Sequence, residues 1–280
     1  MKFIVFLAVI AAVSARAKVK FASQFFVQMS NCTYDTLLNN PHNILIVDPD
    51  DVRLTAEQNE ELKYQGKLVL AYVSVGQAEE FRAYWSDEEI DNEQVEEIYI
   101  RDDPTYPDGK VVRYWNPVWR DMLIDYMMNN VIPYNYSGVF LDYLGNYEQF
   151  PERPTAAADM VQLARSVADA VREHDQLGLV VVHGAAKLWD ENDRMKKFVD
   201  GLSEENVWYG FDGVPRATKY TQSVLEVLRK ANKAKKMTLV EQYVEKKTQI
   251  CSFYKKCFLE ELTCGVFDLQ VTGIVRDCEF

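Results

Sequence analysis

The chain has 280 residues, with 43 acidic against 31 basic side chains, so its formal net charge is −12 at pH 7. Such acidity argues against a nucleic-acid partner, which needs a basic face. It fits either a cationic substrate or a well-solvated exported protein. The length favours one large α/β domain over two small ones.

Residues 1–17 have the features of a secretory signal peptide. Lys2 is followed by the apolar stretch FIVFLAVIAAV and by the small-residue ending SARA, as such signals require. The apolar stretch is far shorter than the ~20 residues that span a bilayer. We therefore expect cleavage after Ala17, a mature domain over residues 18–280, a secreted protein, and no membrane association once the signal is removed.

Short apolar runs alternate with amphipathic segments along the rest of the chain. Eight runs read as strands: 25–29, 44–48, 68–73, 138–142, 179–183, 199–203, 238–242 and 266–271. Segments with helical apolar spacing lie between them, at 55–65, 155–175, 221–236 and 245–262. This alternation predicts an α/β fold, a single (β/α)₈ TIM barrel. A doubly wound open sheet is the alternative, but it has no natural use for an eighth unit.

A long segment separates the third and fourth predicted strands, from Ser74 to Ser137. This length exceeds what one helix and two loops need. The segment is rich in aromatic residues: Phe81, Tyr84, Trp85, Tyr99, Tyr106, Tyr114, Trp115 and Trp119. We expect an insert that folds over the barrel mouth and presents Trp85 or Trp115 to ligand. Such aromatic faces suit sugar binding, because they can cover the apolar C–H faces of pyranose rings. Packing of these rings onto the barrel is the alternative.

The five cysteines all follow the predicted signal: Cys32, Cys251, Cys257, Cys264 and Cys278. An exported chain meets oxidising conditions, so we expect two disulfides and one unpaired thiol. Spacing does not identify the partners, although two cysteines six residues apart on one helix are poorly placed to bridge each other. The sequons at Asn31 and Asn135 fit glycosylation in the same pathway.

Carboxylates stand at the C-terminal ends of several predicted strands. These ends carry Gln28, Asp48, Tyr72 with Ser74, Asp142, His183, Glu204 with Glu205, Glu241, and Gln270. Barrel enzymes place their catalytic groups on this face. A pair of carboxylates there can hydrolyse a glycosidic bond, one protonating the leaving oxygen and the other attacking carbon or activating water. Helix capping is the competing role for Asp48, Glu204 and Glu205.

Other chemistries find little support in the sequence. The chain lacks G-x-S-x-G and the glycine-rich phosphate loops, and it has only three histidines. On the residues alone an all-carboxylate calcium or magnesium site stays open, but we expect neither a metal nor a cofactor.

Five segments, in order along the chain, resemble one enzyme family: VLAYVSVGQAEEFRAYW, YWNPVWRDML, SGVFLDYLGNYE, LVVVHGAAKL and VDGLSEENVWYG. They resemble glycoside hydrolase family 114, the endo-α-1,4-polygalactosaminidase type. The resemblance implies a (β/α)₈ fold and hydrolysis of α-1,4-linked galactosamine-rich polysaccharide. It also implies Asp142 as nucleophile and Glu205 as acid/base.

The resemblance places Asp48, Tyr72, Arg82 and Trp115 along the cleft, and we add Trp85, His183 and Glu241 as candidate substrate-binding residues. A partly deacetylated polymer is cationic, which suits an acidic cleft. The chain departs from the family pattern at Ser137, Gly145 and the His183-Gly184 step.

The rival hypothesis is a lectin-like, catalytically inactive carbohydrate-binding barrel. The presence of both Asp142 and Glu205 favours the enzyme, which we expect to act as a monomer. Endo or exo action and the stereochemical outcome stay open.

Overall fold

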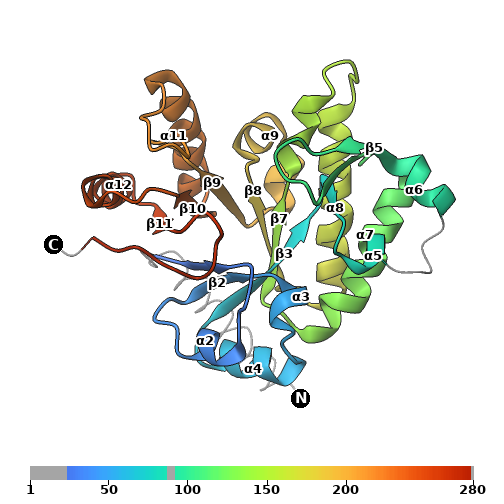
Figure 1. Ribbon diagram of the computed structural model, residues 1–280, viewed down its shortest axis with the longest axis horizontal. Coiled ribbons are helices and arrows are strands. Elements are labelled where there is room, and N and C mark those ends of the chain that lie inside the picture. Colours follow the sequence, from blue (N-terminus) through green and yellow to red (C-terminus); the bar gives the residue numbers. More distant parts are fainter. Residues whose placement is uncertain (1–23, 87–91, 279–280) are drawn as a thin grey trace.

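The computed structural model describes residues 24–86 and 92–278, so the expected signal peptide lies outside the described residues. Within this part of the chain, eight parallel strands pair in chain order into a barrel-like sheet (Figure 1). They are β1 (Phe26–Gln28), β2 (Ile44–Val47), β3 (Leu68–Ser74), β7 (Gly138–Asp142), β8 (Leu179–His183), β9 (Gly201–Glu205), β10 (Met237–Gln242) and β11 (Thr263–Val266). The predicted (β/α)₈ fold is confirmed.

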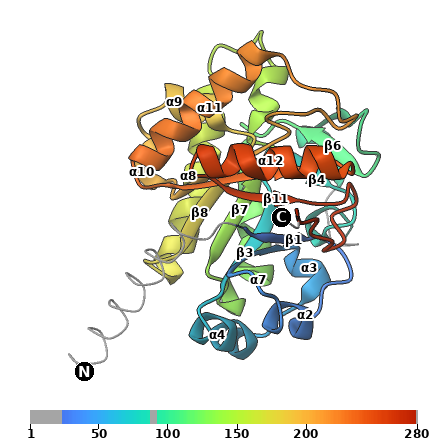
Figure 2. The ribbon, with the colours of Figure 1, turned by 90° about the vertical axis from the view of Figure 1, so that its left-hand side faces the viewer.

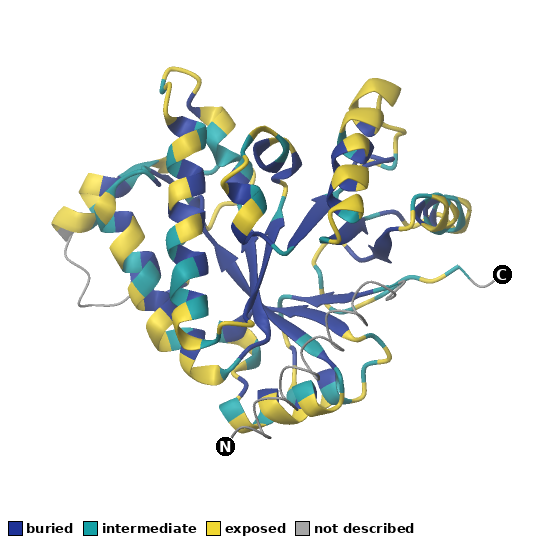
Figure 3. Ribbon diagram, turned by 180° about the vertical axis from the view of Figure 1, so that it is seen from behind, coloured by how far each residue is buried: buried dark blue, intermediate teal, exposed yellow. Residues whose placement is uncertain are grey.

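Helices surround the sheet and turn their buried sides toward it (Figure 3). They are α2 (Tyr34–Leu38), α3 (Pro49–Val52), α4 (Ala56–Tyr64), α7 (Pro117–Asn130), α8 (Ala156–His174), α9 (Ala186–Glu191), α10 (Met195–Phe198), α11 (Thr218–Lys233) and α12 (Lys247–Leu259), with 3₁₀ turns η1 (Ile132–Tyr134) and η2 (Leu144–Gln149). In α8, Met160, Leu163, Val167 and Val171 are buried. The helical spacing of these residues correctly predicted that side.

The strand residues divide into two buried layers because successive side chains leave a strand on opposite faces. Residues such as Ile46, Phe140 and Val181 fill the barrel interior. Their neighbours, for example Val47 and Leu141, pack outward against the helices. Side chains two residues apart on a strand lie on the same face. The residue two positions after an interior side chain therefore also points inward, and at the strand ends such residues face the barrel mouth.

Two of the predicted strand boundaries are wrong. The sixth strand begins at Gly201 instead of residue 199 and extends to Glu205, because its register is set by pairing with β10, where Glu205 lies opposite Glu241. The eighth strand is Thr263–Val266 instead of 266–271. The chain leaves the sheet at Phe267, where the Asp268 side chain accepts hydrogen bonds from Thr272. Gln270 is consequently exposed in a turn.

The C-terminal segment 267–278 lies between the first and last strands of the sheet (Figure 2). Met29 N–H donates to the Val271 carbonyl at 2.9 Å, and Arg276 N–H donates to the Val266 carbonyl at 2.8 Å. Two disulfides, Cys251–Cys278 and Cys257–Cys264, hold this region, while Cys32 is a buried free thiol. The expected two disulfides and one thiol are confirmed, and Cys251–Cys278 fastens the segment to α12.

The segment between β3 and β7 contains a small antiparallel sheet of order β4-β6-β5, made of β4 (Gln77–Glu79), β5 (Tyr99–Asp102) and β6 (Gly109–Val112). The short helix α5 (Ala83–Ser86) follows β4, and α6 (Asn92–Ile98) precedes β5. Tyr84 packs edge-on against Trp119 of α7, with ring centroids 5.2 Å apart. These buried rings join α5 to α7 within the segment.

Candidate active site

Asp142 ends β7 on the interior side of the sheet, two residues after Phe140. The Tyr72 hydroxyl donates to its Oδ2 at 3.1 Å, and the Tyr143 backbone N–H donates to its Oδ1 at 2.6 Å. Tyr143 has a left-handed backbone, with φ 59°, and this sharp turn brings its N–H back onto the carboxylate. Two donors therefore fix the position of the Asp142 carboxyl group.

Glu205 ends β9, on the same interior side as Ser203. Burial raises the pKa of Glu205 to about 7; the charge of His183 opposes this rise, while those of Glu241 and Asp142 add to it. Asp142 and Glu205 thus act on each other electrostatically. A carboxyl group with a pKa near 7 can hold a proton at neutral pH and donate it to a leaving oxygen.

His183 and Glu241 continue this ring of side chains on β8 and β10. Burial lowers the pKa of His183, but the negative charges of Glu241, Asp142 and Glu205, together with Glu204, outweigh burial and raise it to about 9. Its Nδ1 lies 3.6 Å from Glu241 Oε1. The imidazole is therefore a cation at neutral pH, placed among the carboxylates.

Glu241 is held from two sides. The Ser203 hydroxyl donates to Oε1 and the Tyr243 hydroxyl donates to Oε2, each at 2.9 Å. Both donors come from interior positions, Ser203 on β9 and Tyr243 directly after β10. Their hydrogen bonds keep the Glu241 carboxylate beside His183.

Glu204 lies on the opposite face of β9 from Glu205. It accepts a hydrogen bond from Ala186 N–H at 2.7 Å, so its carboxylate caps the start of α9. The helix-capping alternative thus describes Glu204 but not Glu205. Asp48 also caps a helix, because its Oδ1 accepts from Asp50 N–H at the start of α3.

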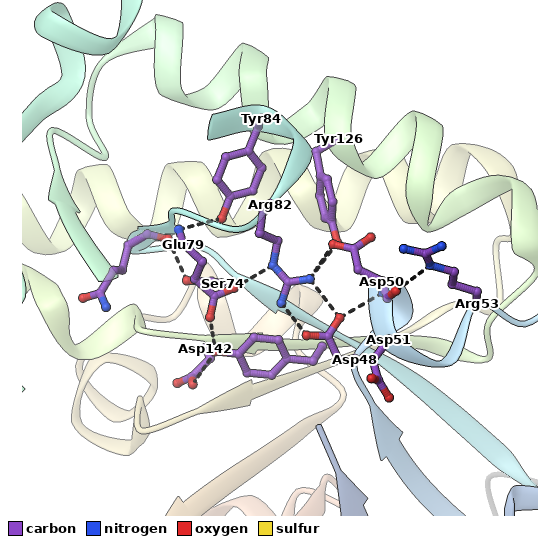
Figure 4. Close-up of polar contacts among 12 residues, drawn as sticks. Asp48, Asp50, Asp51, Arg53, Ser74, Glu79, Arg82, Tyr84, Tyr126 and Asp142 are labelled. Atoms are coloured by element: carbon purple, nitrogen blue, oxygen red, sulfur yellow. Dashed lines mark hydrogen bonds and ion pairs between the residues drawn. The ribbon is translucent and has the colours of Figure 1, made fainter. Parts of the chain in front are cut away.

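Arg82 lies in a buried cluster of acids next to Asp142 (Figure 4). Its guanidinium forms a two-point contact with Asp48, at 2.9 and 2.8 Å, and pairs with Asp50 and Glu79, each at 2.7 Å. The Arg82 side chain is 1% exposed. Burial raises the pKa of Glu79, while the Arg82 charge opposes the rise. These contacts make Arg82 and Asp48 a structural support of the mouth; a direct contact with substrate stays a prediction.

The two tryptophans proposed for sugar binding are half-buried in the segment between β3 and β7. Trp115 contacts Phe150, with ring centroids 4.8 Å apart, and the Arg153 guanidinium lies 4.5 Å above its ring. The ring centroids of Trp85 and Tyr99 lie 6.2 Å apart. These packing contacts are the alternative considered above; binding of sugar by either residue stays a prediction.

Sequence reasoning missed three tyrosines around the acids. Tyr243 holds Glu241, Tyr143 supplies a backbone donor to Asp142, and the exposed Tyr106 lies 6.3 Å from the Tyr143 ring. Burial, with the charges of Glu205 and Asp142, raises the pKa of Tyr106. The period-two pattern of β10 could have identified Tyr243, two residues after Glu241. Nothing local could have placed Tyr106.

In the described part of the chain, no group of three or more His, Cys, Asp or Glu side chains is arranged to bind a metal ion. No helix there has the length and apolar character needed to cross a membrane.

Comparison with known proteins identifies the family. An uncharacterized protein of Methanocaldococcus jannaschii is 25% identical over 236 residues, covering 79% of this chain and 66% of that protein, so the chain spans just under two thirds of this curated relative. The glycoside hydrolase domain of PelA from Pseudomonas aeruginosa gives a TM-score of 0.71 at 14% identity, covering 92% of this chain and 99% of that one. The structure of Aspergillus fumigatus Ega3 in complex with galactosamine gives a TM-score of 0.69 at 12% identity, and the match covers 93% of this chain and 96% of that one.

At these identities the solved structures show the shared fold alone. The model of the family described as "Glycoside-hydrolase family GH114" matches residues 8–254, most of the sequence. The chain belongs to glycoside hydrolase family GH114.

Proposed function

We propose that this protein is a secreted glycoside hydrolase that cleaves α-1,4-linked galactosamine-rich polysaccharide with Asp142 and Glu205. The family supports hydrolysis of a glycosidic bond. The galactosamine bound to Ega3 supports an amino-sugar substrate. The observation that carries the proposal is a pair of inward-facing acids in different environments: the Asp142 carboxyl group accepts two hydrogen bonds, while burial gives Glu205 a pKa of about 7.

The two acids divide the reaction between them. Glu205 donates its proton to the glycosidic oxygen, and the bond from that oxygen to the anomeric carbon breaks. Asp142 attacks the anomeric carbon and forms a glycosyl ester. Glu205, now a carboxylate, removes a proton from water, which displaces Asp142 and releases the sugar with both acids restored.

The surrounding residues hold these groups and shape the cleft. Tyr72 orients Asp142 by its hydrogen bond, while His183 and Glu241 line the mouth beside Glu205. Asp48 and Arg82 support this wall, and Trp85 and Trp115 are proposed sugar contacts farther out. The excess of acids suits a partly deacetylated, cationic polymer. We propose that the protein acts outside the cell as a monomer.

The test is release of new reducing ends from partly deacetylated galactosaminogalactan by the purified protein. Asp142→Asn and Glu205→Gln should each abolish release, because each removes a required charge or proton with little change in volume. Calorimetric binding of the same polymer without any release by the unsubstituted protein would establish the lectin-like rival instead. If the protein neither binds nor cleaves this polymer, an amino-sugar ligand is rejected.

A further inference from the structure

A tight hairpin after β9 holds Phe211 at its tip. Gly210 N–H donates to the Val214 carbonyl at 2.8 Å, and Gly213 N–H donates to the Gly210 carbonyl at 2.9 Å. Gly213 has φ 72°, a left-handed conformation that favours glycine. The Gln249 side-chain amide on α12 donates to the Gly213 carbonyl at 2.6 Å. The chain therefore fixes the position of this tip.

The Phe211 side chain is 47% exposed although the hairpin under it is well anchored. Its ring stacks on Tyr243, with centroids 5.5 Å apart and planes inclined by 25°. The Tyr243 hydroxyl donates to Glu241, which lies opposite Glu205 in the β9–β10 register. The exposed ring therefore lies on the same C-terminal face of the barrel as the proposed acid/base.

A cavity of about 320 Å³ opens beside this ring pair. Its walls come from the loops that follow β9, β10 and β11, so it lies on the C-terminal face of the barrel. The residues that line it include Phe211, Asp212, Tyr243, Lys246, Phe267 and Leu269. The volume lies at the lower end of the range for ligand sites.

The cavity combines aromatic faces with charged groups of both signs. The nearby Arg276 pairs with Glu245 at 3.4 Å, and Asp212 accepts from Val214 N–H through Oδ1. Because acids and bases nearly balance there, the aromatic rings, and not net charge, set the kind of ligand. A pyranose ring fits this description, since one face carries C–H groups and its edge carries hydroxyls.

We propose that this cavity is a distal subsite, in which a pyranose unit of the substrate, remote from the cleaved bond, stacks on Phe211. The proposal rests on the proposed function, because it assigns the cavity to the same polysaccharide chain. The prebuilt hairpin lowers the ordering cost of binding, since the ring is already held in place. The subsite favours long substrates over short ones.

The experiment compares Phe211→Ala with the unsubstituted protein on α-1,4-linked galactosamine oligosaccharides of increasing length. KM should rise roughly two- to tenfold for the longer oligosaccharides, the range expected for loss of one aromatic contact. The kcat and KM for the shortest cleaved oligosaccharide should not change. Phe211→Trp should restore the length dependence. Phe258→Ala is the matched control, because Phe258 is an exposed phenylalanine on α12, outside the cavity walls.

The outcomes separate the two proposals. Equal kinetics for Phe211→Ala and the unsubstituted protein at every length, or the same change in Phe258→Ala, overturns the subsite and leaves the hydrolase intact. If the unsubstituted protein releases no reducing ends, calorimetry with the longest oligosaccharide decides the subsite alone. Weaker binding by Phe211→Ala then supports it, whereas unchanged binding, or none by either protein, overturns it.

Discussion

Glu204 and Glu205 are neighbours on β9, yet their carboxylates lie on opposite faces of the sheet. Glu204 accepts from Ala186 N–H at the start of α9, whereas Glu205 faces the barrel mouth among Asp142, His183 and Glu241. The alternation of a β-strand is sufficient to place one of two adjacent, identical side chains against a helix and the other in the proposed catalytic position.

This pair offers a matched test of the catalytic assignment. Glu205→Gln should lower kcat by about 10²- to 10⁴-fold, because an amide cannot donate the acid's proton. Glu204→Gln should retain kcat, because its amide oxygen can still accept from Ala186 N–H. Reducing-end assays on both proteins, with circular dichroism to confirm folding, measure the effect. A larger loss in Glu204→Gln would reverse the assignment.

The value of kcat/KM should fall as the pH rises through about 7. Glu205 must be protonated to act as acid, so activity is lost as pH rises through its pKa of about 7. The charge of His183 lowers that pKa; therefore His183→Gln should move the alkaline limb to higher pH.

His174→Gln is the control for this shift, since His174 lies at the end of α8, where its ring contacts Asn135. Its pH profile should match that of the unsubstituted protein. If the alkaline limb of the His183→Gln profile stays in place or moves to lower pH, His183 does not lower the pKa of Glu205.

Arg82→Met should lower the free energy of unfolding by about 3–5 kcal/mol, because it leaves the carboxylates of Asp48 and Glu79 buried without their cation. Arg120→Met is the control: Arg120 pairs with Asp121 at an exposed site, where loss of the pair should cost less than about 1 kcal/mol. Urea denaturation gives both values. If the free energy of unfolding falls by the same small amount in both variants, the buried cluster does not depend on Arg82.

Removal of the Cys251–Cys278 disulfide should destabilise the protein more than removal of Cys257–Cys264. The first closes 27 residues and the second 7, and the loop-closure estimate gives about 3.5 against about 2.4 kcal/mol. Denaturation of the two double Cys→Ser variants under non-reducing conditions measures the difference. Hydrogen exchange at Met29 should also increase in the first variant only, since its N–H bonds to the C-terminal segment. The opposite order of stabilities would count against this role.

The sequence predicts the strands of the barrel well, because strands buried on both faces are continuous apolar runs. Asp142 could be placed for the same reason, since it ends such a run. The choice between Glu204 and Glu205 could not be made locally. It depends on where β9 begins, and pairing with β10, more than thirty residues later, sets that register.

The role of Arg82 was equally beyond local reasoning. Its partners Asp48 and Tyr126 are 34 and 44 residues away in the chain, and only the folded barrel brings them together. The same holds for Phe211 and Tyr243, which come from different loops. Patterns along the chain identify elements, whereas contacts between loops on the barrel mouth depend on the whole fold.

The position of the C-terminal segment beside β1 has a consequence for synthesis. Gln24 and Asp277, which join the two ends of the sheet, are 253 residues apart. At roughly 5–20 residues per second, a ribosome needs about 10–50 seconds to make the chain between them. Throughout that interval the outer edge of β1 lacks its neighbour, and an unpaired edge can add a strand from another molecule. The strand made first is completed last, so its free edge can pair with another chain until the final residues are made and folded.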